Sequence, residues 1–110
     1  SYAEYVRKSR RAEAQSVLMD IGTRQQQRLL DTRTYAGATP PSDADTQTAL
    51  TALNTSVPPS VSASYTLSIA AGGTPPTFTA TATPTGNQAR DTCGTLSLTH
   101  TGAKSPSTCW

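Results

Sequence analysis

The sequence predicts an α+β fold in which a long N-terminal helix packs on an antiparallel meander of three to four strands, followed by a C-terminal disulfide loop. Three observations indicate this fold. Residues 1–33 contain no proline and are rich in good helix formers. Three later segments alternate apolar with hydroxyl-bearing side chains, which is typical of half-buried strands. Two cysteines, Cys93 and Cys109, lie near the C-terminus.

A helix over residues 1–33 would be roughly 45–50 Å long, more than one face of a domain this small covers. The apolar side chains of its C-terminal half share a face that is predicted to pack on the sheet: Ala14, Val17, Leu18, Ile21 and Leu29. A second, rotated face carries Tyr2, Tyr5 and Val6. Because the basic run of residues 7–11 interrupts the first face, the N-terminal half is predicted to protrude or to pack on another chain. The alternative is a helix that lies flat on the sheet.

Residues 34–61 are predicted to form a connecting loop, because they hold four prolines. Within this loop, Ser42 is a candidate cap for a short helix that runs to about Leu53. Residues 62–110 are predicted to form the sheet and the disulfide loop, with strands over 63–70, 77–83 and 94–100. Short connections favour an antiparallel meander. The last segment is predicted to return to the sheet edge, where Trp110 covers the end of the core.

The length and charge of the chain limit the classes of function that it could have. A chain of 110 residues is one domain. Residues 1–33 hold seven of its nine basic and four of its seven acidic residues. The net charge of +2 is too small to indicate a nucleic-acid partner by itself. The Thr- and Ser-rich remainder is typical of extended strands and secreted surfaces.

The two cysteines are predicted to form a disulfide that stabilises the fold by roughly 3 kcal/mol and indicates an oxidising compartment. Two free buried thiols are the alternative. His100 lies between them in the sequence, but this spacing matches no zinc pattern and lacks a fourth ligand. No metal and no cofactor are therefore expected.

Several stretches resemble type IV pilins, most closely the small minor pilins of Gram-negative type IV pili. Residues 1–14, SYAEYVRKSRRAEA, are similar to the pilin stretch that follows the membrane half of the helix. Residues 24–27 (RQQQ) and 31–36 (DTRTYA) are similar to the helix end of minor pilins. Cys93-Gly94-Thr95-Leu96 and the final Cys109-Trp110 are similar to their closing pattern.

The resemblance implies a structural subunit, a minor pilin, that acts in pilus assembly and hence in twitching motility, adhesion or DNA uptake. It implies as partners other pilin subunits in a filament, the assembly machinery, and the inner membrane through a preceding N-terminal segment. The sequence would then be an N-terminally truncated soluble domain. The head would lie in the periplasm before assembly and in the extracellular pilus afterwards.

Two sets of residues are candidates for contacts with partners. The exposed patch on the first half of the helix is expected to face other subunits: Tyr2, Tyr5, Val6, Arg7, Arg10 and Arg11. Two basic residues of the head are candidates for contact with DNA or another surface: Arg90 and Lys104.

Three other functions remain open at this point. A pseudopilin of type II secretion has similar topology, although the major pseudopilin typically has a calcium site and no disulfide. A DNA-receptor pilin would use basic residues of the helix against phosphates, but the nearly neutral head and its few aromatic residues favour a structural role. An enzyme is not indicated, because the chain has one histidine and no Ser/His/Asp or paired-carboxylate signature.

Overall fold

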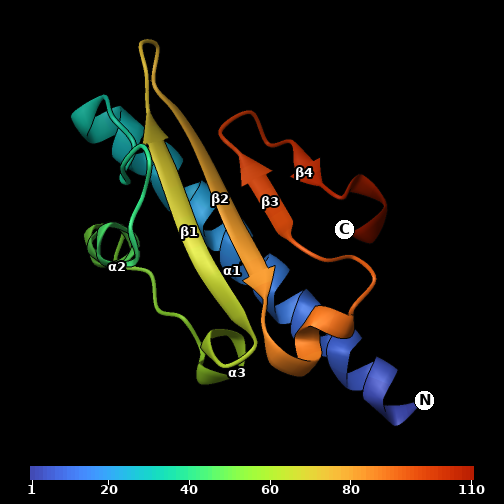
Figure 1. Ribbon diagram of the computed structural model, residues 1–110. Coiled ribbons are helices and arrows are strands. Elements are labelled where there is room, and N and C mark those ends of the chain that lie inside the picture. Colours follow the sequence, from blue (N-terminus) through green and yellow to red (C-terminus); the bar gives the residue numbers. More distant parts are fainter.

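The computed structural model describes all residues 1–110 and places one long helix, α1 (Tyr2–Thr32), behind a four-stranded sheet (Figure 1). The strands follow the order β1-β2-β3-β4, each antiparallel to its neighbour. Their bounds are β1 (Tyr65–Gly72), β2 (Thr77–Pro84), β3 (Leu96–Thr99) and β4 (Lys104–Ser105). The predicted α+β meander is confirmed, and β4 is the return of the last segment to the sheet edge. None of the helices has the length and apolar character needed to cross a membrane.

The strand register separates the two faces of the sheet. Ile69 pairs with Ala80, and Ala80 pairs with Leu98, so apolar side chains line up on the face toward α1. The other face carries mainly hydroxyl groups, on Thr66, Ser68, Thr79, Thr81, Thr83, Ser97 and Thr99. This alternation follows from the two-residue period of a strand and gives the sheet one side that must be covered.

The core lies between α1 and the sheet. Its largest fully buried side chains include Leu18, Ile21, Ile69, Phe78 and Leu96.

Leu29, which was predicted to pack on the sheet, is only half-buried, and so is Leu67 on β1. A polar residue, Gln25, occupies the helix position between Ile21 and Leu29 and is fully buried. Its side-chain amide donates to the carbonyl of Ala36 at 2.7 Å and accepts from the Ala36 amide at 2.8 Å. The helix is thus joined to the following loop by hydrogen bonds where apolar packing was expected.

The connecting segment contains the predicted short helix, α2 (Asp43–Ala52). The Ser42 hydroxyl accepts from the Asp45 amide, and the Asp45 carboxylate accepts from the Ser42 amide, each at 3.0 Å. The bond from the Ser42 backbone amide is the main cause that holds the pKa of Asp45 below its ordinary value, and the Ser42 side chain lowers it further. On the buried side, the Thr46 hydroxyl accepts from the Ile69 amide at 3.3 Å, which fixes α2 beside β1.

The N-terminal half of α1 protrudes less than predicted. Two short helices, α3 (Pro59–Ser62) and η1 (Gly86–Arg90), pack against it. Arg10 donates to the Ser64 hydroxyl at 3.1 Å, and Ser60 donates to the Glu13 carboxylate. The prediction was wrong from the second turn onward, because Arg10 and Glu13 find hydrogen-bond partners just before β1 and in α3.

Candidate nucleic-acid interface

A hollow of about 400 Å³ lies between the start of α1 and the segment that follows η1. Four basic and two acidic side chains line it, so its formal charge is +2, equal to that of the whole chain. The basic members are Arg7, Lys8, Arg11 and Arg90, and the remaining lining residues are Glu4, Asp91 and Thr92. The hollow thus brings together basic residues of both candidate sets: Arg7 and Arg11 of the helix patch, and Arg90 of the head.

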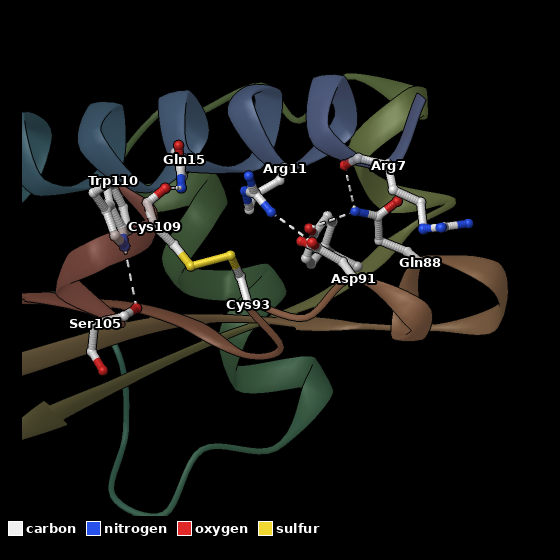
Figure 2. The surroundings of a disulfide bond; sticks show 10 residues. Arg7, Arg11, Gln15, Gln88, Asp91, Cys93, Ser105, Cys109 and Trp110 are labelled. Carbon is white, nitrogen blue, oxygen red and sulfur yellow. Dashed lines mark hydrogen bonds and ion pairs between the residues drawn. A yellow bond between two sulfur atoms is a disulfide. The ribbon is translucent and has the colours of Figure 1, made fainter. Parts of the chain in front are cut away.

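A buried glutamine holds η1 against α1 and so positions the far wall of the hollow. The side-chain amide of Gln88 donates to the Arg7 carbonyl at 2.8 Å (Figure 2) and to the Tyr65 hydroxyl at 2.9 Å. Gln88 itself is 3% exposed. Burial is the main cause that raises the pKa of Tyr65, and the nearby Asp91 charge raises it further. These groups link α1, β1 and η1 beneath the hollow.

An ion pair lies in the wall of the hollow. Arg11 Nη1 is 2.6 Å from Asp91 Oδ1 (Figure 2), and the two side chains are 15% and 7% exposed. The other carboxylate oxygen, Asp91 Oδ2, is buried and has no hydrogen-bond partner. The remaining three basic side chains of the hollow take part in no ion pair. The hollow therefore offers three free cations and one that is held by the protein itself.

The protein-family and structure comparisons agree with this fold. Residues 1–97 match the family model described as "Type IV minor pilin ComP, DNA uptake sequence receptor". The chain belongs to this ComP minor pilin family. A solved structure, described as a type IV pilin from Shewanella oneidensis, is 27% identical with a TM-score of 0.69, over 94% of this chain and 97% of that chain. No curated protein sequence matches the chain.

The family defines the class of function. The chain is a minor pilin of type IV pili, a role that includes DNA uptake, and its family and fold are structural rather than enzymatic. The predicted resemblance is confirmed, and the pseudopilin alternative gives way to it. Family membership also implies assembly with other pilins into a pilus at the cell surface.

The disulfide predicted for this minor pilin is present between Cys93 and Cys109 (Figure 2). It closes the segment that carries β3 and β4 and ends with η2 (Ser107–Cys109). The Gln15 side chain of α1 donates to the Cys109 carbonyl at 2.7 Å. Trp110 is half-buried and packs against the core, as predicted, and its indole donates to the Ser105 carbonyl at 3.2 Å.

The two basic head residues of the pilin do not form one surface. Arg90 lines the hollow with Arg7 and Lys8. Lys104 lies on β4, with its ammonium 5.7 Å from the centre of the Trp110 ring, and is not part of the hollow. Arg90 and Lys104 were grouped as candidates because both follow the helix in the chain. The fold instead brings Arg90 back to the helix.

The expected subunit-contact patch is divided in the same way. Tyr2 and Tyr5 are 81% and 69% exposed, and Val6 is half-buried. Arg10 and Arg11, in contrast, donate to groups of the pilin itself. A subunit contact by Arg11 would require its internal ion pair to open.

Sequence reasoning missed Gln88, Asp91 and Thr92. All three lie in the polar connection between β2 and the first cysteine, which was treated only as a loop. A glutamine or an aspartate in such a loop gives no periodic signal. The only clue was charge, because Arg90-Asp91 holds two of the five charged residues after residue 33.

Proposed function

We propose that this minor pilin binds double-stranded DNA during uptake, and that Arg7, Lys8 and Arg90 contact backbone phosphates. The observation that carries the proposal is the hollow, in which three unpaired cations converge in a chain of this family. Phosphate contacts by Lys and Arg supply most of the affinity of non-specific DNA binding and position a protein on the duplex. The Thr92 hydroxyl adds an uncharged donor of the kind that commonly bonds to phosphate oxygens.

This proposal reverses the preference drawn from the sequence. A purely structural role was favoured because the head is nearly neutral and has few aromatic residues. In the fold, Arg24 is paired with Asp20 and Arg11 with Asp91. The unbalanced charge is then concentrated in the hollow, which is the arrangement that attracts a polyanion.

DNA binding is proposed as an addition to filament assembly. Tyr2, Tyr5 and Val6 are proposed to contact neighbouring pilin subunits, with the assembly machinery as a further partner. Before assembly the head would lie in the periplasm of a Gram-negative cell, held to the inner membrane by a segment that precedes Ser1. The exposure of the two tyrosines and the family membership support this arrangement.

The test is fluorescence anisotropy of labelled duplex DNA titrated with the protein at two salt concentrations. The wild-type chain is expected to bind with an affinity that falls as salt rises. A Lys8→Ala/Arg90→Ala variant is expected to bind more weakly, with the slope of log affinity against log salt reduced by about 2. The matched control is Arg33→Ala/Lys104→Ala, which removes the same charge from exposed positions outside the hollow.

The control variant is expected to bind nearly as well as the wild type. Equal losses in both variants would mean that the phosphate contacts are not confined to the hollow. Absence of salt-dependent binding by the wild-type protein would refute the DNA-binding proposal and leave the filament role.

A further inference from the structure

We propose that Asp91 limits the affinity of the hollow for phosphate, because it competes with the ligand for Arg11 and places a negative charge in the wall. This inference deepens the DNA-binding proposal and rests on it. It assigns Asp91 a role opposite to that of its neighbour Arg90. Arg90 attracts the phosphate, and Asp91 determines how tightly it is bound.

The geometry of the pair supports competition. Arg11 reaches Asp91 through one nitrogen and one oxygen, at 2.6 Å, and no second hydrogen bond joins the two groups. A guanidinium has five N–H donors in a fork that matches carboxylate or phosphate with two parallel bonds. Because Arg11 also lines the hollow and gives Asp91 only one hydrogen bond, its other donors are available to a phosphate bound there.

The charge of Asp91 is balanced by one ion pair, through a single hydrogen bond from Arg11. The Asp91 side chain is 7% exposed, and Oδ2 is buried without a hydrogen-bond partner. Charges act more strongly where water is excluded. The other acid of the hollow, Glu4, has a side chain that is 73% exposed, so solvent screens it. Asp91 is therefore the main repulsive charge that an incoming phosphate meets.

The expected consequence is a gain of binding when the charge of Asp91 is removed. Asp91→Asn keeps the shape and an acceptor for Arg11, but it raises the formal charge of the hollow by one. We expect this variant to bind duplex DNA about tenfold more tightly at low salt. Arg11→Gln, which leaves Asp91 without its cation, is expected to bind about tenfold more weakly.

A double variant distinguishes an effect of charge on DNA affinity from a failure of the protein to fold. Arg11→Gln/Asp91→Asn replaces the ion pair by two neutral amides, and its affinity is expected to lie between those of the single variants. Thermal unfolding of each variant identifies any that do not fold. If Asp91→Asn alone fails to fold, a double variant no tighter than Arg11→Gln would overturn the inference. The inference is also overturned if a folded Asp91→Asn variant binds DNA no more tightly than the wild type.

A second measurement distinguishes this inference from the DNA-binding proposal. Backbone amide NMR signals are followed while sodium diphosphate is added to the wild-type protein and to Asp91→Asn. Shifts at Lys8, Arg90 and Thr92 that saturate at lower diphosphate in Asp91→Asn would support the inference even if no DNA binds. DNA binding without any diphosphate-dependent shift at these residues would refute the inference and leave DNA binding in place.

Discussion

The two halves of α1 are held to the rest of the molecule by different forces. In the C-terminal half, Ala14, Leu18 and Ile21 are fully buried against the sheet. In the N-terminal half, the contacts are mainly polar and include a hydrogen bond from Gln88 to the Arg7 carbonyl and the ion pair of Arg11 with Asp91. One continuous helix thus combines an apolar attachment with a polar one. The polar end is also where the hollow and the exposed tyrosines lie.

This difference matters because the two attachments differ in strength and in specificity. Burial of apolar surface is strong and non-directional, so the C-terminal half anchors the fold. Hydrogen bonds and ion pairs contribute less net stability but require defined partners in defined positions. The N-terminal half can therefore present charged groups to a ligand while the core keeps the helix in place.

The largest expected effect is loss of the apolar attachment. Leu18 is fully buried, so Leu18→Ala removes its packing and leaves a cavity in the core. We expect the free energy of unfolding to fall by about 2–5 kcal/mol. Urea denaturation followed by circular dichroism measures this change. A loss below about 1 kcal/mol would mean that the sheet does not depend on this half of the helix.

The disulfide lies at the junction of the two halves, because Gln15 in the middle of α1 bonds to the Cys109 carbonyl. Replacing both Cys93 and Cys109 by serine is expected to cost about 3 kcal/mol, mainly because the unfolded chain gains freedom. The measurement is again urea denaturation, compared with the wild type under reducing conditions. If the reduced wild type is as stable as the oxidised protein, the bond contributes nothing to this junction.

A smaller effect is expected in the polar half. Gln88→Ala removes the bonds to the Arg7 carbonyl and the Tyr65 hydroxyl, and we expect a loss of about 1–3 kcal/mol. Because the bond from Gln88 lowers the pKa of Tyr65, its removal should raise that pKa further above the ordinary value of 10.0.

The pH dependence follows from the sign of the Tyr65 shift. The fold favours the protonated phenol, so this stabilisation is complete below pH 10.0 and is lost as pH rises through the raised pKa. Tyrosinate absorbance during alkaline titration should show one late tyrosine, which titrates later still in Gln88→Ala. An unchanged late step would mean that Gln88 does not bond to this hydroxyl in solution.

The sequence predicted the apolar attachment better than the polar one. The spacing of Val17, Leu18 and Ile21 indicates a buried stripe, and the Ser42 cap indicates α2, because both depend on neighbours in the sequence. The partner of Arg11 is 80 residues away, so no local pattern reports it. Charged residues 7–11 were therefore assigned to another chain, when two of them bind groups of this one.

The hollow escaped prediction for the same reason. Its basic residues come from α1 and from the segment after β2, which meet only when η1 packs on the helix. The disulfide, in contrast, was predicted because two cysteines allow a single pairing within the chain. The number of cysteines is enough to predict the disulfide, whereas the hollow exists only once the chain has packed.

The smallest expected effect on stability tests whether the first turns of α1 act outside the folded chain. Tyr5 is 69% exposed, so Tyr5→Ala should change the free energy of unfolding by less than about 0.5 kcal/mol. If the residue contacts a neighbouring subunit, the same change in the full-length protein should reduce its recovery in sheared pili. Tyr5→Phe, which keeps the ring, is the matched control and should assemble normally. Normal recovery of Tyr5→Ala in pili would remove Tyr5 from the subunit interface, and a large loss of stability would show that this turn belongs to the fold.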